Sequence, residues 1–533
     1  MEWSDMADKA EVIVCGAGHN SLVAAAYLAK AGLDVLVLER NEMVGGGVIS
    51  REIPGAPGFI CNPHAQGIIL MAANPVIADD ELGLISQFGL KMTEFDTMYA
   101  TQFDDGGFIV QYCDVDKTCA SIAQFSERDA EAYRRFARMS ARLLPLLSQG
   151  LFTPPTPLGS LFMMLDQSRE GRLVLSELMN SAYNIIDNRF DHERVKLHFM
   201  HYAAELMLSP EQNGTGIVPY LLTGLIHAYK PFRVKGGSGR LSQALAGCIE
   251  HHGGRIRTGA TVQWITSAGG KVTGVVLDTG EVIAASKGVL GCVHPHDVAA
   301  MIEGVDPFVA RQAARAALSN FGALNSHVAL NEPPKYLGGE EVNRAMMVEC
   351  VPADMEAFRR SFDELRYGYV PDYNNYNVAI LSENDPSVVP DPGKASLYLY
   401  KFAPLQLADG GNEGWDGIKE ETAARFVKNY GAYVTNWTDE NIIASYSETP
   451  LDMYRHNPVF KYGDIFGVGT FLNQFFSYRP TPELGQYSVP GVEGLYLVGP
   501  TQHPGGGVTG GGRATAIKLM DDLGMALSPT FKM

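Results

Sequence analysis

The chain has 533 residues, which is too long for one hydrophobic core and predicts two or three domains. Its 46% of hydrophobic and 19% of charged residues are typical of a globular protein and exclude a disordered one. The net charge of −18 argues against nucleic acid or an anionic membrane surface as a partner.

The first predicted elements are a strand, a glycine turn and a helix. Residues 12–15 form a buried strand, Gly16 and Gly18 make the turn, and Asn20 and Ser21 cap the helix that follows. The free N–H groups at the start of such a helix bind a pyrophosphate. Ser21 takes the place of the third glycine in the usual pattern and is small enough to let the helix pack closely on the strand.

A carboxylate completes this unit. Gly32 ends the helix, residues 34–38 form a second buried strand, and Glu39 follows that strand about 20 residues beyond Gly18. A carboxylate at this place accepts hydrogen bonds from an adenosine ribose. The sequence therefore predicts a dinucleotide-binding unit.

The loop after the second predicted strand extends the predicted cofactor site, and a helical region follows further along the chain. Arg40 and the glycines of 45–47 lie in the loop after the second strand, where glycines let the backbone approach a cofactor closely. A polar and aromatic segment, residues 59–64, comes next. Residues 126–207 have helical patterning, which a proline-rich break at 151–157 interrupts.

The patterning of a nucleotide-binding domain returns further along the chain. Glycines within 236–239 open a predicted helix over 241–250. Residues 255–265 are predicted as a strand that contains Val262. A hairpin turn and one more strand follow, at 278–280 and 288–291.

The composition changes between about residue 307 and residue 480, where the sequence predicts a separate antiparallel sheet with helices. Strands are predicted there at 377–381 and 395–400. After this region, residues 494–499 form another buried strand, which runs into a glycine-rich turn at 504–512 and a helix over 513–523.

Other features exclude several classes of site. The seven cysteines are scattered and include no Cys-x-x-Cys pair, so neither a disulfide framework nor a zinc knuckle is predicted. His198 and His201 lie on a predicted helix but have no third ligand, so no metal site is predicted. Because the N-terminus lacks a secretory pattern and no apolar run reaches about 18 residues, the protein is expected to be cytoplasmic and without a transmembrane segment.

These motifs together resemble those of the FAD-dependent phytoene desaturase-like oxidoreductases. The resemblance points to the branch of pyridine nucleotide-disulphide oxidoreductase domain-containing protein 2-like and phytoene dehydrogenase-related proteins, and it covers nearly the whole chain. Its most specific parts are Gly16-Ala17-Gly18-His19-Asn20 with Glu39-Arg40, the helix start at Gly236-Gly237, and the strand 494–499 that runs on to His503-Pro504-Gly505-Gly506-Gly507.

The resemblance implies an α/β fold with two parts. One is a discontinuous, Rossmann-like FAD-binding domain of the glutathione-reductase and amine-oxidase type, and the other is an α+β substrate domain that carries an antiparallel sheet. The FAD-binding domain is expected to comprise residues 1–80, 232–305 and 485–533. A mainly helical substrate or cap region is expected at 81–231, and the substrate domain with its antiparallel sheet at 306–484.

The resemblance also implies which residues hold FAD. Gly16 and Gly18 are expected at the pyrophosphate, Glu39 at the adenosine ribose and Val262 at the adenine. A helix N-terminus after the last glycine-rich turn is expected to stabilise an anionic reduced flavin. The further expected cofactor contacts are His19, Asn20, Arg40, Gly45, Gly46, Gly47, Cys292, Gly499, Pro500, Gly507, Val508 and Thr509. Ser21 and Cys292 depart from the residues that are usual in the family.

Four residues are candidates for catalysis. His64 follows a family-like loop near the flavin, Tyr478 and Arg479 precede the C-terminal cofactor segment, and His503 lies inside it. Two interpretations stay open for Arg479, which either polarises a carbonyl or carboxylate group or makes a structural ion pair. His64 and His503 are likewise either acid–base groups or structural residues.

The implied activity is desaturation of a C–C bond in an apolar or alicyclic substrate, by hydride transfer to flavin N5. Two alternatives stay open, a redox-neutral flavin-dependent isomerase or hydratase and a non-catalytic flavin-binding interaction protein. Because only one complete dinucleotide fingerprint is present, the expected electron acceptor is oxygen, a quinone or a carrier protein. Residues 158–165 and 217–226 form either a buried helix pair or an interfacial patch for peripheral membrane contact.

Overall fold

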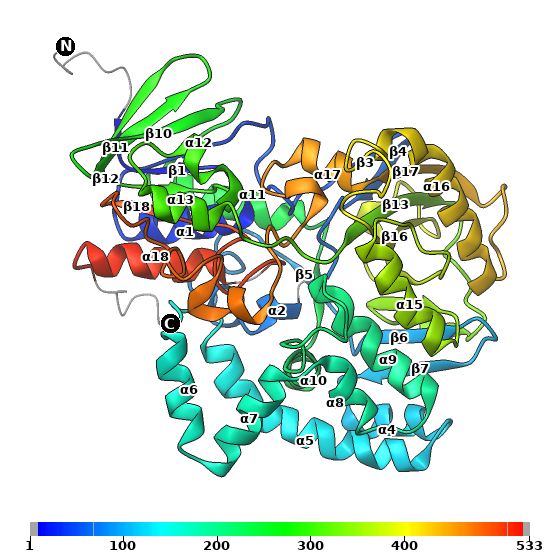
Figure 1. Ribbon diagram of the computed structural model, residues 1–533. Helices are drawn as coiled ribbons and strands as arrows, with labels where there is room; N and C mark the ends of the chain where they lie inside the picture. Colours follow the sequence, from blue (N-terminus) through cyan, green and yellow to red (C-terminus); the bar gives the residue numbers. More distant parts are fainter. Residues whose placement is uncertain (1–8, 68, 509, 526–533) are drawn as a thin grey trace.

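Two lobes, each built on a seven-stranded sheet, make up the computed structural model, which describes residues 9–67, 69–508 and 510–525 (Figure 1). The first sheet has the strand order β10-β11-β12-β1-β2-β9, and β18 pairs with β12 outside this path. Its strands are β1 (Lys9–Cys15), β2 (Val35–Leu38), β9 (Arg255–Arg257), β10 (Val262–Ala268), β11 (Lys271–Leu277), β12 (Val282–Gly291) and β18 (Leu495–Leu497).

The parallel part of this sheet joins segments that are far apart in the sequence. β1 lies between β2 and β12, so that Val14 is opposite both Val37 and Leu290, and β18 runs parallel to β12. All four residues of β2 are buried, as a parallel strand covered on both faces requires. The predicted discontinuous Rossmann-like domain is confirmed. The predicted strand at 255–265 is instead two strands, because a turn at residues 258–261 separates β9 from β10.

Three helices cover the sheet beside the glycine turns. α1 (His19–Lys30) packs against α11 (Gly239–His251) and α18 (Gly511–Asp522), and residues 20–29 of α1 are buried on every side. The predicted cap of α1 by Asn20 and Ser21 is wrong. Gly18 is the N-cap without a side-chain hydrogen bond, because the Asn20 side chain accepts a hydrogen bond from the N–H of Gly512 instead.

The second sheet has the strand order β17-β13-β16-β15-β14-β6-β7. Its pairs are antiparallel except for β14 and β6, which run parallel. The predicted α+β part with an antiparallel sheet is therefore confirmed, and β6 and β7 join it from the mainly helical stretch of the chain. Its strands are β6 (Thr97–Phe103), β7 (Phe108–Tyr112), β13 (Gly322–Leu330), β14 (Met347–Val351), β15 (Tyr376–Ile380), β16 (Ala395–Ala403) and β17 (Ile442–Glu448).

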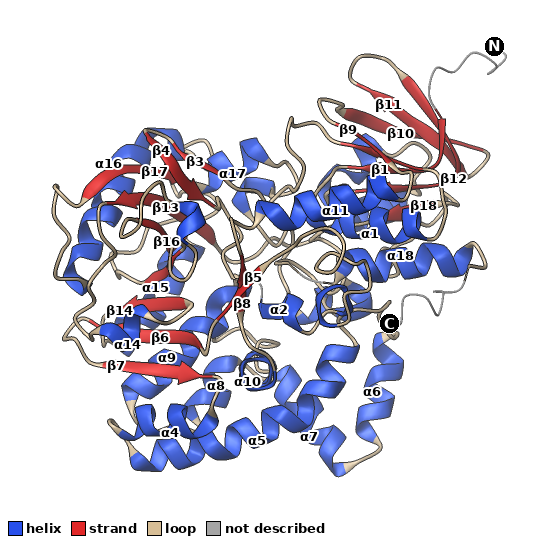
Figure 2. Cartoon of the chain, turned by 180° about the vertical axis from the view of Figure 1, so that it is seen from behind, coloured by secondary structure: helices blue, strands red, loops and turns tan. Residues whose placement is uncertain are grey.

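Helices pack on both faces of the second sheet, whose elements Figure 2 shows from behind: Trp415 and Phe426 belong to the core on one face, and Phe199 and Phe358 belong to the core on the other. Side-chain caps mark where several of them begin: Ser126 accepts from the N–H of Asp129 at the start of α5, and Thr449 forms a capping box with Asp452 in α17. The helices of this lobe are α4 (Val115–Ala123), α5 (Glu127–Gln149), α6 (Leu158–Asp166), α7 (Arg169–Met179), α8 (Ala182–Asp187), α9 (Glu193–Ala203), α10 (Val218–Ala228), α14 (Glu340–Asn343), α15 (Met355–Arg366), α16 (Trp415–Asn429) and α17 (Pro450–His456).

Short elements make up the rest of the described chain. The remaining strands form two pairs, β3 (Arg51–Ile53) with β4 (Ala56–Cys61), and β5 (Met92–Glu94) with β8 (Phe232–Val234). The remaining α-helices are α2 (Ile69–Ala72), α3 (Pro75–Ala78), α12 (Val298–Met301) and α13 (Pro307–Ala313). Single turns of 3₁₀-helix lie at Ala204–Leu206, Pro295–Asp297, Pro386–Val388, Tyr430–Tyr433, Lys461–Gly463, Leu472–Gln474 and Phe476–Tyr478.

Residues 158–165 and 217–226 are predicted as either a buried helix pair or an interfacial patch. They correspond to α6 and α10, and these two helices differ in burial. α10 is largely buried, whereas Leu165 is the buried residue of α6, and Met163 and Met164 are 66% and 54% exposed. Among the helices in the described part of the chain, none is both long and apolar enough to cross a membrane.

Candidate active site

A cavity opens where the glycine turns of the first sheet face the loop that follows α17. Backbone from the turn after β1, from the loop after β2 and from the turn after β18 forms one side, and side chains of the second lobe form the other. The described residues that line it are Gly18, His19, Asn20, Ser21, Gly46, Gly47, Val48, His64, Ala65, Cys292, Asn457, Val459, Phe460, Ile465, Gly499, Pro500, Gly507 and Val508. Eleven of the predicted site residues are thus brought together.

The turn after β1 leaves room for a ligand at the start of α1. Gly16 has a φ of +89°, which favours glycine, and a Cβ there would lie 3.2 Å from the Cβ of Cys292. A Cβ at Gly18 would meet no described atom within 4 Å, so open space lies at the N-terminus of α1. Because the first N–H groups of a helix have no acceptor within it, this is a place where an anion binds.

The loop after β2 approaches this turn closely. The N–H of Gly45 donates to the carbonyl of Ala17 at 2.8 Å. Gly46 has a φ of +59°, and a Cβ there would lie 3.0 Å from the Cα of Gly18. The two backbone segments therefore touch in a way that a side chain at position 46 would prevent.

Glu39 is buried at the end of β2, and backbone groups bind its carboxylate. Its Oε2 accepts from the N–H of Ala17 at 2.7 Å, and its Oε1 accepts from the N–H of Asn41 at 2.9 Å. The N–H of Ala260 donates to the carbonyl of Glu39 at 2.8 Å, which brings the start of β10, and with it Val262, beside Glu39. Glu39 and Val262 lie outside the described lining of the cavity. The same is true of Gly16, Gly45 and the exposed Arg40.

Arg479 supports the cavity wall formed by the turn after β18. Its Nη2 donates to the carbonyls of Phe466 at 3.0 Å, Val468 at 2.9 Å and Pro500 at 2.9 Å. Burial lowers the pKa of Arg479 to about 10, which Asp464 partly opposes. Since Pro500 lines the cavity, the guanidinium holds the backbone that shapes it.

Three of the predicted catalytic residues are not part of the described lining of the cavity. Of the two interpretations left open for Arg479, its contacts favour a structural role, because its donors are directed at backbone carbonyls. Tyr478 is 39% exposed and is not part of the described cavity lining. The Nε2 of the buried His503 lies 2.6 Å from the carbonyl oxygen of Gly150, again outside that lining. Thr509 lies outside the described residues.

His64 is the predicted catalytic residue that the structure places in the cavity. Its ring centroid lies 5.7 Å from that of Phe460 and 5.9 Å from that of His456. Both ring nitrogens are buried and have no hydrogen-bond partner among the described residues. Burial lowers the pKa of His64 to about 4, while the nearby Glu448 raises it. The imidazole is therefore neutral at pH 7 and available to accept a proton.

Two other titratable side chains, those of His19 and Cys292, line the cavity. The Nε2 of His19 lies 3.2 Å from the carbonyl oxygen of Gly507, and burial lowers its pKa to about 4. Burial raises the pKa of the Cys292 thiol to about 12, so the thiol stays protonated at neutral pH.

Part of the cavity wall carries no sequence motif. Asn457, Val459, Phe460 and Ile465 line the cavity from the loop after α17. In the sequence, this partly apolar segment is distinguished only by its position before the C-terminal glycine-rich turn. That position assigns no role to any single residue. Glu448 and Arg51, which lie behind His64, were also beyond sequence reasoning.

The residues present fit FAD. A helix N-terminus with open space, a close glycine backbone and a buried carboxylate beside the turn provide the groups that a dinucleotide requires. The remaining lining includes several apolar side chains, which suits a planar ring system.

Comparisons with known proteins agree with this geometry. Residues 22–335 match the family described as flavin containing amine oxidoreductase. Pyridine nucleotide-disulfide oxidoreductase domain-containing protein 2 of Rattus norvegicus is 28% identical over 96% of this chain and 94% of its own length. A limonene dehydrogenase subunit of Castellaniella defragrans is 25% identical over 97% of this chain and 95% of its own length.

Solved structures show the same fold. Cyclohexylamine oxidase from Brevibacterium oxydans has a TM-score of 0.59 at 14% sequence identity, and the match covers 97% of this chain and 100% of that one. The family match covers more than half of the chain and confirms the resemblance drawn from the motifs. The protein is thus an FAD-dependent oxidoreductase, and the chain belongs to the flavin containing amine oxidoreductase family.

Proposed function

We propose that the protein is an FAD-dependent dehydrogenase that introduces a C=C bond into an apolar or alicyclic substrate. The observation that carries this proposal is the composition of the cavity wall opposite the glycine turns. Val459, Phe460 and Ile465 lie there with His64, and none of the described lining residues is an aspartate, glutamate, lysine or arginine. Such a wall offers an apolar surface and one neutral base, but no charged group to bind a polar substrate.

We further propose roles for the residues around the cofactor. The N–H groups at the start of α1, together with Gly18 and Gly46, bind the pyrophosphate, and Glu39 binds the adenosine ribose. Arg40 and Val262 contact the phosphate and adenine portions. Asn20, Cys292, Gly499, Pro500, Gly507 and Val508 enclose the ribityl chain and the flavin ring.

In a desaturation, bound FAD supplies the hydride acceptor. His64 takes the second hydrogen as a proton: the C–H bond on the neighbouring carbon breaks, its electron pair becomes the new π bond, and the proton bonds to a ring nitrogen of His64. Phe460 and Ile465 exclude water from the reacting carbons. A limonene dehydrogenase among the relatives supports an alicyclic substrate.

An anaerobic titration of the purified holoprotein tests this proposal. The absorbance band of the oxidised flavin at about 450 nm is followed while one compound class is added at a time. The classes are a cyclic monoterpene, a polyene in micelles, a cyclic ketone and a small unsaturated acid, and the products are identified. Bleaching by one class, with a product that has lost two hydrogens, is the expected result. Product that forms only after pre-reduction of the flavin, without net bleaching, would instead indicate an isomerase or hydratase. Neither bleaching nor product with any class would favour a non-catalytic flavoprotein.

A further inference from the structure

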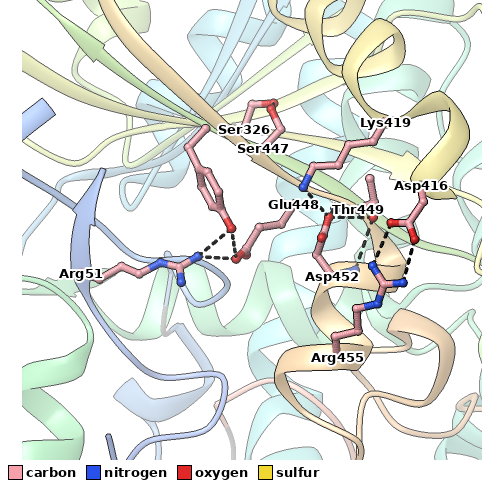
Figure 3. A network of polar contacts seen from close by, with 10 residues as sticks. Arg51, Ser326, Asp416, Lys419, Ser447, Glu448, Thr449, Asp452 and Arg455 are labelled. Atoms are coloured by element: carbon pink, nitrogen blue, oxygen red, sulfur yellow. Dashed lines mark hydrogen bonds and ion pairs between the residues drawn. The ribbon is translucent and has the colours of Figure 1, made fainter. Parts of the chain in front are cut away.

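A cluster of charged and polar side chains lies behind His64. Glu448 ends β17 and is buried, and it forms an ion pair with Arg51 at the start of β3 (Figure 3). The hydroxyl of Tyr446 donates to Oε1 of Glu448 at 3.1 Å and accepts from Nη2 of Arg51 at 3.2 Å. The proposed desaturation uses none of these three residues.

Glu448 and His64 both have polar atoms that lack a partner. Oε2 of Glu448 and both ring nitrogens of His64 are buried, and among the described residues none forms a hydrogen bond with them. Asn325, the register partner of Glu448 on the neighbouring strand β13, donates from Nδ2 to the carbonyl of Pro63 at 2.9 Å, so the residue before His64 lies beside the strand pair that carries Glu448. The two groups also act on each other electrostatically. Burial raises the pKa of Glu448, but His64 and Arg51 lower it below its ordinary value overall. Unpaired buried polar atoms are costly, so such a pair beside a cavity calls for a functional explanation.

Three titratable groups besides Glu448 lie around His64, namely Arg51, His456 and His327. Arg51 and His456 lower the pKa of His64, whereas Glu448 raises it. His327 on β13 lies with its ring centroid 5.5 Å from that of Tyr398 and 6.4 Å from that of Tyr446. Burial lowers the pKa of His327 to about 4, so it is neutral at pH 7. Glu448 is therefore an anion beside His64, and Arg51 is the cation that pairs with it.

The cluster also reaches the surface. The side chain of Glu448 is 6% exposed, that of Arg51 is 33% exposed, and Tyr446 is half-buried. Glu448 thus has two partly exposed partners, Tyr446 and Arg51.

We propose that Glu448 is a positioning residue for His64, and that Glu448 and Tyr446 form the path by which the substrate proton leaves the flavin cavity. This inference rests on the proposed function. The proton that His64 takes from carbon makes an imidazolium, which the Glu448 carboxylate stabilises. The imidazolium N–H bond then breaks as the proton passes to Oε2 of Glu448 through an intervening water, because the two groups form no direct hydrogen bond. From Glu448 the proton moves through the Tyr446 hydroxyl to water, which restores neutral His64 and anionic Glu448.

The first arm of the test needs no substrate. The pKa of His64 is measured by NMR in the FAD-loaded protein with ¹³C-labelled histidine, and its resonance is assigned by its loss in His64→Gln. Arg51→Gln is expected to raise this pKa by about one unit, because it removes a nearby cation. Adding Glu448→Gln to Arg51→Gln is expected to lower it again by a similar amount.

The matched control for this arm is Arg189→Gln. Arg189 pairs with Glu177 at 2.9 Å in the helical part of the chain, and its side chain is 26% exposed, close to the value for Arg51. The control should leave the His64 titration unchanged. The same His64 pKa in wild type, Arg51→Gln and the double variant would overturn the proposal.

The second arm uses whichever compound bleaches the flavin. Glu448→Gln is expected to slow anaerobic flavin reduction about 10- to 100-fold with little change in substrate affinity, and Glu448→Asp should recover part of the rate. The rate of wild type should fall as pH drops towards the pKa of His64, and Glu448→Gln should move this limb to lower pH. An unchanged rate and profile in Glu448→Gln would reject the path.

The two proposals fail in different ways. Absence of bleaching by every compound would reject the proposed function, whatever the titration of His64 shows. Bleaching by a substrate, with His64 and Glu448 uncoupled in the first arm, would reject only the proton path.

Discussion

Oδ1 of Asn20 accepts a hydrogen bond from the N–H of Gly512 at 3.2 Å, and this contact joins the first turns of α1 and α18. Asn20 also lines the cavity. Because a helix N-terminus carries a partial positive charge, the meeting of two of them concentrates positive potential beside the cavity. This arrangement suits an anionic cofactor and explains why the Asn20 side chain does not cap its own helix.

Gly512→Ala should therefore disrupt both folding and flavin binding. A Cβ at Gly512 would lie 2.1 Å from the backbone oxygen of Asn20 and 2.9 Å from the Cβ of Val23, so the two helices would have to separate. We expect a loss of about 3 kcal/mol in the free energy of unfolding and a lower flavin-to-protein absorbance ratio.

Gly417→Ala in α16 is the control for this substitution. A Cβ there would meet no described atom within 4 Å, and alanine favours a helix over glycine, so this variant should gain up to about 1 kcal/mol. Chemical denaturation measures both changes. Equal stability of Gly512→Ala and wild type would show that the contact of α1 with α18 is looser than described.

Arg513 and Glu81 make a second link at α18. Nε and Nη2 of Arg513 donate to the two carboxylate oxygens of Glu81 at 2.8 and 2.9 Å, and the Tyr27 hydroxyl also binds Glu81. The two charged side chains are 12% and 7% exposed. Glu81→Gln should cost about 3 kcal/mol of unfolding free energy, since it leaves a largely buried guanidinium without its counter-charge.

The control is Lys518→Gln in the same helix. Lys518 pairs with Asp522 at 2.6 Å, but the two side chains are 25% and 38% exposed, so solvent screens the pair and its loss should cost less than about 1 kcal/mol. Similar losses in Glu81→Gln and Lys518→Gln would contradict a special role for the buried pair.

Local patterns were sufficient to predict the unit of β1, α1 and β2 in the first sheet. The strand, glycine turn and helix around Gly16 and Gly18 follow each other directly in the sequence, and each signal lies within a few residues. The partners within the second sheet are not local. Thr101 on β6 donates to Glu349 on β14 across 248 residues, and no periodicity in either segment indicates this parallel pairing.

The predicted site residues likewise divide into those that a local pattern identifies and those whose contacts depend on the tertiary structure. His64 follows a recognisable loop and does reach the cavity. Arg479 carries a charge at a suitable place in the sequence, but residue type does not reveal that its partners are the carbonyls of Phe466, Val468 and Pro500. The coupling of His64 to Glu448 depends on the contact of Asn325 on β13, which pairs with β17, with the loop before α2, and only the tertiary structure provides this contact.

His64→Gln should slow flavin reduction by a substrate at least about 100-fold, because it removes the proposed base from the cavity. Flavin content and the free energy of unfolding should change little, since the ring nitrogens of His64 make no hydrogen bond with the described residues. His456→Gln is the control, because His456 lies 5.9 Å from His64 but does not line the cavity. Stopped-flow reduction at pH 7.5 separates the two, and a rate for His64→Gln equal to that of His456→Gln would exclude His64 as the base.

Buried histidines should make the protein sensitive to mild acid. Burial is the main cause that lowers the pKa of six histidines from 6.5 to about 4: His19, His64, His198, His294, His327 and His503. Between pH 6.5 and pH 4 the unfolded chain binds more protons at these positions than the folded protein does. Stability is therefore complete above pH 6.5 and falls as the pH drops through this window.

Each such histidine contributes up to about 1.4 kcal/mol per pH unit to the slope of unfolding free energy against pH. His503→Gln removes one of the six groups, so its slope between pH 6 and pH 5 should be smaller by about this amount. His251→Gln removes an exposed histidine and should keep the slope of wild type. Denaturant titrations at half-unit intervals of pH give the three slopes. If His503→Gln kept the full slope, the imidazole of His503 would have to be protonated in the folded protein, and its contact with the carbonyl of Gly150 would then be that of a cation.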